Sequence, residues 1–468
     1  MQKSKPFRLT AFSMALALGL AGCAVGPAYQ RPATPEPVAF KELEGWVPAA
    51  PADALERGPW WQLFGDPTLD ALVAGVEVSN QNVAAAVANY AAARAAVQQE
   101  RAALFPSLSL TLGADRSGVR GQGADNRYRL NLGGSWEPDV WGRLRAGVTS
   151  AQAGAEASAA DLASARLSAQ GELVSNYFTI RALDAQRALL ERTIAGYERE
   201  LQITTNRFNA GIAARTDVLQ AQTQLATAKS DELSLRRQRA QFEHAIAILV
   251  GKAPSEFALA PLPDWRVTVP DVPVGVPATL LQRRPDIAAA EREVAAANAE
   301  IGVARAAYFP NIGLSGSLGT SGSRVGDLFK LSNAAWSFGL SAAQAIFNAG
   351  ATRAAVAGAE ARHQAAVARY RQTVLTAFGD VEDQLTATRV LAQQQDLRRQ
   401  ASEAADLVEQ QIMNRYRAGQ VGYTEVVQAQ VTALNARRSL VQVQSDRQTV
   451  AVALIQSLGG GWHAGSQP

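Results

Sequence analysis

Cys23 is the residue of this chain with the most definite chemistry, since it is the only cysteine and directly follows Leu20-Ala21-Gly22. Residues 1–22 start with basic side chains and continue with an apolar run of about a dozen residues, the pattern of a secretory signal peptide. Small residues before a cysteine at this place resemble a bacterial lipobox, in which the lipidated cysteine becomes the first residue of the mature protein. We therefore predict a covalent lipid on Cys23 and no disulfide. The alternative is an ordinary cleaved signal followed by an unrelated cysteine.

No other residues form a pattern that predicts catalysis or metal binding. The three histidines, His244, His363 and His463, are scattered along the chain, and no cysteine and histidine spacing suits a metal ion. No glycine-rich phosphate loop follows a predicted strand. We predict packing or solvent-facing roles for the histidines, and a protein that is not an enzyme, holds no metal and has no cofactor besides the lipid on Cys23.

The charge and hydropathy of the chain exclude two further classes. The formal net charge is +3, and the signal segment holds Lys3, Lys5 and Arg8 but no acid, so the mature chain is close to neutral. A nucleic-acid partner is therefore not expected. No later segment has about 18 uninterrupted apolar residues, so we expect no transmembrane helix, and any membrane crossing must be made by strands.

The chain contains the same motif twice. RFNAGIAARTDVLQAQ occupies residues 207–222, and RYRAGQVGYTEVVQAQ occupies residues 415–430. A second pair lies upstream, with RAALFPSLSLTLG at 101–113 and RAAYFPNIGLSGS at 305–317. Solenoid repeats recur about every 20–50 residues, whereas these pairs are 208 and 204 residues apart. The sequence therefore predicts a duplicated domain, in which each half builds the same structure.

Each copy of the longer motif has the residues of a helix–turn–helix. Gly211 and Gly419 are placed as the glycines that end a long helix in the left-handed conformation. Thr216 and Thr424 are placed to cap a returning helix.

Charged residues flank both turns. Arg207 and Arg415 precede the turns and complement the negative end of the helix dipole, while Asp217 and Glu425 begin the returning helices. An acid at that place is favoured by about 0.3–1 kcal/mol. Helix capping alone would account for all four residues. Several copies of the acids around one passage would instead select cations.

The motifs are separated by periodic segments in the same order in each half. A helix of roughly 24 residues ends at a Phe-Pro pair, where proline breaks it. Strict alternation of apolar and polar residues follows, which predicts strands of about ten residues with one apolar face. A long proline-free helix with coiled-coil spacing comes next, and a returning helix of about 35 residues closes each half. The predictions are helices at 81–104 and 286–308, strands within about 107–137 and 311–345, long helices at about 142–209 and 349–417, and returning helices ending near Gly251 and Gly459.

The predicted strands have the length of a tilted crossing of a lipid bilayer. The alternative is a hairpin that lies on a soluble core. One chain supplies four strands, and an open sheet in lipid would leave unpaired backbone groups that cost several kcal/mol each. Two chains would make a barrel filled by side chains, whereas three chains leave room for a passage lined by the polar faces. We favour the trimer, with helices of about 100 Å that project from the membrane.

Five segments of the chain resemble those of a known family. They are CAVGPAYQRP (23–32), PWWQLFGDPTLDAL (59–72), LLQRRPDI (280–287), RYRAG (415–419) and LGGGW (458–462). Together they are similar to the TolC-type outer-membrane factors, specifically the NodT/OprM-like efflux lipoproteins of tripartite resistance-nodulation-division pumps. The resemblance covers essentially all of the mature chain.

This resemblance implies a fold class that is mainly α with membrane β. The implied assembly is a trimeric twelve-strand transmembrane β-barrel continued by a long twelve-helix periplasmic α-barrel, with two structural repeats per chain. We divide the chain into a signal peptide (1–22), a lipidated extended tether (23–58), a first repeat (59–251), an inter-repeat equatorial segment (252–285), a second repeat (286–460) and a C-terminal tail (461–468).

The implied function is an outer-membrane exit duct of a tripartite efflux system, which passively conducts small molecules such as drugs or other toxic compounds. The implied partners are two further copies of the chain, a periplasmic adaptor (a membrane fusion protein), an inner-membrane pump of the resistance-nodulation-division type and outer-membrane lipid. The implied location is the bacterial outer membrane, with a lipid anchor and a projection into the periplasm.

The resemblance also assigns roles to the two tips. Glu425 matches an acidic position at the periplasmic constriction, and we add Asp217 and Gln428 to this predicted gate. Relatives often have a second aspartate where this chain has Gln428, so a weaker acidic constriction is expected here. The residues predicted to dock the adaptor are Arg207, Phe208, Ala210, Gly211, Arg415, Tyr416, Ala418 and Gly419.

Three alternative functions stay open from the sequence. An exit duct could serve type I protein secretion or metal export, although a metal exporter would be expected to have more Met and His than Met413 and three histidines. A structural or adhesive surface lipoprotein could also use long alanine-rich helices. The alternating segments after both Phe-Pro pairs argue against that last reading.

Overall fold

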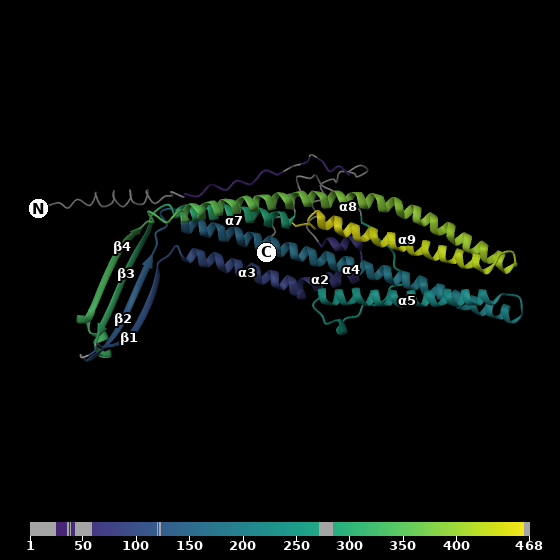
Figure 1. The fold of residues 1–468 in the computed structure, drawn as a ribbon, viewed down its shortest axis with the longest axis horizontal. Coiled ribbons are helices and arrows are strands. Elements are labelled where there is room, and N and C mark those ends of the chain that lie inside the picture. The colour runs from purple at the N-terminus through teal and green to yellow at the C-terminus, as the bar shows by residue number, and fades with distance from the viewer. Residues whose placement is uncertain are drawn as a thin grey trace. The chain divides into compact units, whose positions relative to one another are not determined.

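The computed structural model describes residues 25–34, 37, 39–42, 59–118, 120, 123–270 and 284–462, which form long helices and one antiparallel sheet (Figure 1). The predicted signal peptide and the predicted lipid on Cys23 lie outside these residues, as do His463 and most of the predicted tether. None of the helices in these ranges combines the length and the hydropathy that a membrane crossing requires.

Both repeats contribute to each of two compact units. Of the described residues, one unit comprises those within Met1–Thr34, Ala88–Ala159 and Ala289–Thr373, and the other comprises those within Pro35–Val87, Ala160–Ala288 and Val374–Pro468. The long helices α4 (Arg143–Asn209) and α8 (Ala351–Arg417) run through both units. The sheet belongs to the first unit, and both helix–turn–helix tips belong to the second.

The sheet has four antiparallel strands in the order β1-β2-β3-β4. They are β1 (Ser107–Gly118), β2 (Ala124–Trp136), β3 (Asn311–Gly322) and β4 (Ala334–Ala343). Strand β2 of the first repeat pairs with β3 of the second, so among the described strands the outer edges of β1 and β4 have no partner. All four strands lie within the ranges predicted from the alternating pattern.

The register brings apolar residues of all four strands into one row. Leu110 is opposite Leu132, Leu132 is opposite Leu318, and Leu318 is opposite Trp336. These side chains are exposed, from 44% for Leu132 to 80% for Trp336. Positions one residue earlier or later point to the other face, and they include Ser109, Gly133, Ser317 and Ser337. The sheet therefore has an uncovered apolar face and a polar face in the single chain.

The helices agree with the predicted ranges to within a few residues. The long helices have 67 residues each, and the returning helices α5 (Arg215–Leu249) and α9 (Tyr423–Ser457) have 35 each. The helices before the strands, α3 (Gln81–Ala102) and α7 (Pro285–Ala306), have 22 residues each. Equal lengths in the two halves are what a duplicated domain requires.

The helices of the second unit pack through apolar residues at coiled-coil spacing. Leu190 and Tyr197 of α4 form a buried cluster with Leu235 of α5 and Leu434 of α9. The cluster therefore holds the second repeat against the first. Burying one such side chain stabilises the fold by about 1.5–3 kcal/mol.

Helix α2 (Pro67–Ser79) begins at an Asp-Pro pair. Asp66 is its N-cap, and its Oδ1 accepts hydrogen bonds from the N–H groups of Thr68 at 2.9 Å and Leu69 at 3.3 Å. Pro67 occupies the first helical position, where its missing N–H removes no hydrogen bond.

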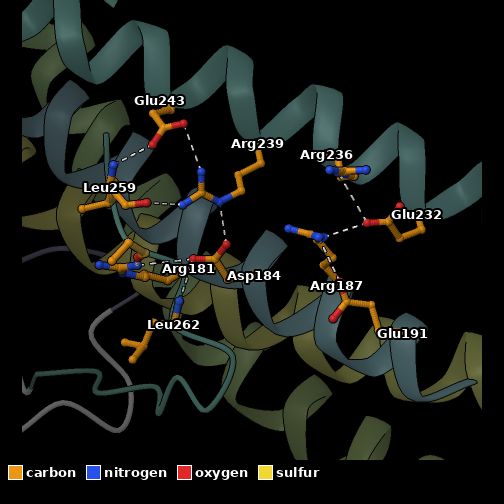
Figure 2. A network of polar contacts seen from close by, with 11 residues as sticks. Arg181, Asp184, Arg187, Glu191, Glu232, Arg236, Arg239, Glu243, Leu259 and Leu262 are labelled. Carbon is orange, nitrogen blue, oxygen red and sulfur yellow. Dashed lines mark hydrogen bonds and ion pairs between the residues drawn. The ribbon is translucent and has the colours of Figure 1, made fainter. Parts of the chain in front are cut away.

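A buried polar network fixes the segment that follows α5 (Figure 2). Asp184 of α4 accepts hydrogen bonds from Arg239 Nε of α5 at 2.7 Å and from the Leu262 N–H at 3.1 Å. Arg239 also donates to the Leu259 carbonyl at 2.5 Å, and Glu243 accepts from the Leu259 N–H at 2.6 Å. The Asp184 and Arg239 side chains are only 1% and 11% exposed. Residues 259–262 are thus clamped onto the first repeat.

We expect Asp184→Ala to destabilise the protein by about 3–5 kcal/mol, because it leaves two buried arginines, Arg181 and Arg239, without their shared carboxylate. Thermal unfolding of the purified protein and limited proteolysis within 254–262 would measure the effect. The control is Glu191→Ala, which removes a 53% exposed partner of Arg187 and should cost less than about 1 kcal/mol. Equal losses of stability in the two variants would contradict the proposed role of Asp184 in holding residues 259–262 on the first repeat.

Candidate functional site at the helix–turn–helix tips

The turn between α4 and α5 is closed by two backbone hydrogen bonds. The Ile212 N–H donates to the Arg207 carbonyl at 2.8 Å, and the Gly211 N–H donates to the Phe208 carbonyl at 2.9 Å. Gly211 has a φ of 76°, a conformation that other residues rarely adopt. This is a Schellman motif with glycine at C′, so the prediction for Gly211 is confirmed.

The turn between α8 and α9 repeats this geometry. The Gln420 N–H donates to the Arg415 carbonyl and the Gly419 N–H donates to the Tyr416 carbonyl, both at 2.9 Å. Gly419 has a φ of 73°. The two tips therefore share one backbone conformation. The prediction that Gly419 ends its helix in the left-handed conformation is also confirmed.

Thr216 and Thr424 do not cap the returning helices, so that prediction is wrong. The N-cap residues are Ala214 and Gly422, whose extended backbone is followed directly by helix, and neither residue has a side-chain oxygen that could form a capping hydrogen bond. The Schellman turns are short, and the helices begin early enough to place each threonine in the first turn. The Thr424 hydroxyl instead accepts a hydrogen bond from Gln220 Nε2 at 3.3 Å.

The tips of the two repeats contact each other through aromatic and basic side chains. The guanidinium of Arg207 lies 4.9 Å from the centre of the Tyr416 ring, a cation–π contact. The rings of Tyr416 and Tyr423 are 5.5 Å apart with an interplanar angle of 56°. One buried cluster contains Tyr416 of α8, Tyr423 and Val426 of α9, and Ala221 of α5. The structure thus joins Arg207 and Tyr416, which the sequence assigned to separate tips.

Tyr423 is the main tip residue that sequence reasoning missed. It is only 3% exposed, and it occupies the place where the first motif has Arg215. Burial raises the pKa of its hydroxyl well above the ordinary value, and Glu200 and Tyr416 raise this pKa further. The replacement of an arginine in the first motif by an aromatic residue in the second was the signal that could have found it.

A second missed feature is a buried amide–carboxylate contact behind the tips. Gln430 Nε2 of α9 lies 2.8 Å from both carboxylate oxygens of Glu200 on α4. Burial raises the pKa of Glu200, whereas the hydrogen bond from Gln430 lowers it. The contact ties the two repeats together, and it joins residues 230 positions apart in the sequence.

The predicted gate residues lie in the first two turns of the returning helices. Asp217 and Glu425 occupy the first turns of α5 and α9, where the helix dipole favours them. Among the described residues, neither forms an ion pair with any partner. Glu425 and Gln428 are exposed, whereas Asp217 is half-buried and contributes to the raised pKa of Tyr423.

The predicted docking residues divide into two sets. Arg207 and Tyr416 contact each other, and Tyr416 is 8% exposed with a buried hydroxyl that has no hydrogen-bond partner in the described structure. The remaining residues present an exposed surface at the turns, and they are Phe208, Ala210, Gly211, Arg415, Ala418 and Gly419.

Gly419→Ala tests the left-handed turn. No atom lies within 4 Å of a Cβ added at Gly419, so its expected cost of about 1–2 kcal/mol comes from the backbone alone. Gly196→Ala is the matched control, because this helical glycine is equally free of neighbours and alanine should stabilise the helix by about 0.5–1 kcal/mol. Thermal unfolding should shift in opposite directions for the two variants. A shift in the same direction would contradict the assignment.

The remaining candidate chemistry is sparse. Within the described ranges, no group of three or more His, Cys, Asp and Glu residues is placed to hold a metal ion. His244 is exposed on α5, and His363 is half-buried on α8. The two tips, where the duplicated motif lies, are therefore the candidate functional site of the described chain.

Comparison with known proteins gives the same match for both repeats. A protein-family model described as "Outer membrane efflux protein" matches residues 73–252 and 276–460. The probable efflux pump outer membrane protein TtgC of Pseudomonas putida is 32% identical, over 95% of this chain and 94% of its own length. The pyoverdine export outer membrane protein OpmQ of Pseudomonas aeruginosa is 32% identical over 98% of both chains.

Solved structures agree with the sequence comparisons. The outer-membrane channel OprN superposes with a TM-score of 0.85 and 32% identity, covering 94% of this chain and 100% of its own. The two-repeat, mainly helical fold is therefore shared with known outer-membrane channels over nearly all of its length.

Proposed function

The chain belongs to the outer membrane efflux protein family, and from this premise we propose that three copies of it form one exit duct across the outer membrane. The family's function is that of an outer-membrane channel in an efflux system with an adaptor and an inner-membrane pump, and it is not an enzyme class. The observation that carries the function is the family match over both repeats.

The proposed trimer follows from the sheet. The outer edges of β1 and β4 offer unpaired backbone groups, which cost several kcal/mol each in lipid. Three copies would join these edges into a closed twelve-strand barrel, wide enough for a passage. The exposed row of Leu110, Leu132, Leu318 and Trp336 would face lipid, and the serine-rich face would line the passage.

The duct is proposed to be passive and gated at the tips. In the resting state, the inner helices of the second repeat (about 349–457) narrow the mouth, and docking of the adaptor and pump separates the hairpins. Glu425 and Asp217, in three copies each, would place carboxylates around the mouth and favour cations. Gln428 adds no charge there, which weakens the acidic ring. The exposed turns support this proposal, because they leave a surface free for an adaptor.

The remaining parts of the proposal concern the anchor, the pump and the cargo. We propose a lipid on Cys23 that tethers each copy to the outer membrane, and a pump of the resistance-nodulation-division type. The cargo is proposed to be small toxic compounds, in line with the efflux names of relatives such as TtgC. OpmQ is named for pyoverdine export, so a natural export product is the second candidate class.

A photo-crosslinking amino acid at Ala210 or Ala418 tests the proposed docking surface. Both positions are exposed at the turns, and in living cells they should capture a periplasmic adaptor that mass spectrometry identifies. The same amino acid at Ser109, on the polar face of the sheet, should capture none. Capture of cell-wall or surface proteins alone would favour the structural lipoprotein instead.

Glu425→Gln tests the gate in single-channel recordings. Removing three carboxylates from the mouth should lower cation selectivity and change conductance. Gln428→Asp, which adds three carboxylates nearby, should raise cation selectivity. Glu198→Gln serves as a control, because it removes an exposed acid of α4 that pairs with Lys229 and is not a predicted gate residue. Unchanged selectivity and conductance in Glu425→Gln would remove this residue from the gate.

A further inference from the structure

The buried network around Asp184 in the first repeat has a counterpart in the second repeat that lacks the acids. Helices α4 and α8, and likewise α5 and α9, begin and end 208 positions apart, so Arg447 is the equivalent of Arg239. Arg239 donates to Asp184 at 2.7 Å and to Glu243 at 3.0 Å (Figure 2). The residues at the positions equivalent to these two acids are Ala392 and Ala451. The second repeat thus has the arginine without its carboxylates.

Arg447 consequently has a guanidinium group that no carboxylate balances within the described ranges. Its Nη1 donates to Gln395 Oε1 of α8 at 2.7 Å, but its Nε is buried and has no hydrogen-bond partner. The other two arginines of α9, Arg437 and Arg438, both form ion pairs with acids. A buried donor without a partner costs free energy, so an anion that balances this guanidinium would be bound favourably.

The Arg447 side chain lines a pocket between α8, α9 and the extended segment 265–269. Gln448 Nε2 holds this segment on α9, because it donates to the Thr268 carbonyl at 2.9 Å. The pocket has a volume of about 480 Å³, which lies in the range of small-molecule sites, roughly 300–1,000 Å³. Besides Arg447, its lining residues are Trp265, Arg266, Val267, Val269, Gln395 and Gln444.

The lining of the pocket combines positive charge with an apolar wall. Arg266 is exposed, and it forms no ion pair with any described residue. Both charged residues of the lining are therefore unpaired arginines, whose planar groups suit the two oxygens of a carboxylate. Trp265 and the two valines offer a surface for a carbon skeleton, and the two glutamine amides can donate or accept hydrogen bonds.

We propose that this pocket binds a small organic acid. The carboxylate of the ligand takes the place of the acids that Arg447 lacks, and its carbon skeleton lies against Trp265. A carboxylate is the expected anion, because Arg239, the equivalent arginine, binds two carboxylates. An inorganic anion would leave the apolar part of the lining without a partner.

The proposed site is separate from the tips. Gln395 on α8 and Arg447 on α9 are each more than 20 residues from the tip ends of their helices, at Arg417 and Tyr423. At 1.5 Å per residue, this separation is about 35 Å. The site therefore lies outside the predicted gate and docking surface, and its existence does not depend on the proposed trimer.

Fluorine NMR of full-length protein labelled with 5-fluorotryptophan tests the site directly. The resonance that is absent from the Trp265→Phe variant belongs to Trp265. The probes are benzoate, hexanoate, benzyl alcohol, which has a ring but no charge, and inorganic phosphate, which has charge but no carbon skeleton. We expect a saturable shift of the Trp265 resonance with at least one of the two acids and with neither control. No saturable shift with either acid, or equal saturation with phosphate, would overturn the proposal.

Arg447→Gln tests the charge of the pocket. Loss of a charge-assisted hydrogen bond should weaken binding of the acid by about tenfold or more. The matched control is Arg237→Gln, because Arg237 lies outside the pocket and its partner is likewise an amide, Gln241 at 3.2 Å. This control should bind the acid as the parent does. Unchanged binding in Arg447→Gln would show that this arginine does not hold the ligand.

Ala392→Asp tests whether the ligand replaces a lost acid. Aspartate at this position restores the residue that the first repeat has as Asp184. Because it supplies a carboxylate from within the chain, it should compete with the acid and raise its dissociation constant by about tenfold or more. Ala392→Asn has nearly the same size without the charge and should keep the binding of the parent. Equal binding by the Asp and Asn variants would contradict the replacement.

Discussion

Among the strands that the structure describes, the outer edges of β1 and β4 have no partner, and this constrains everything else that the chain can form. In lipid, a strand edge without a partner is far more costly than one in water, and four strands cannot close on themselves. The number of helices around the proposed tunnel follows from the number of strands that closes the barrel, because each strand pair continues into one long and one returning helix. In the proposed assembly, the pairing of the strand edges therefore determines how many helix–turn–helix tips there are.

Local patterns predicted most of the fold. Period-two and coiled-coil spacing placed the strands and α4 within a few residues, and glycine chemistry predicted the turns at Gly211 and Gly419. The caps were missed at Ala214 and Gly422, since a Schellman turn can pass directly into the next helix without a capping side chain. The Gln430–Glu200 and Asp184–Arg239 contacts were also missed, because their partners are 230 and 55 residues apart and no local pattern links them.

The candidate site was predicted in position but not in its internal contacts. The sequence treated the two tips as equivalent, whereas the structure joins Arg207 of one to Tyr416 of the other. Tyr423 in place of Arg215, and Val408 in place of Glu200, show that the repeats diverged where they touch.

The buried polar network around Asp184 influences which copies of the two repeats pair with each other during assembly. Chains with similar repeats are prone to domain swapping, in which one copy takes the repeat of another. This network fixes residues 259–262 on the first repeat. Arg284 bonds to Asp380 of α8 at 3.0 Å and so fixes the beginning of the second repeat. Only residues 263–283 connect these two fixed points. Because both ends of this connection are held by contacts within the chain, the second repeat stays at a high effective concentration beside the first repeat of its own chain, which opposes entangled oligomers.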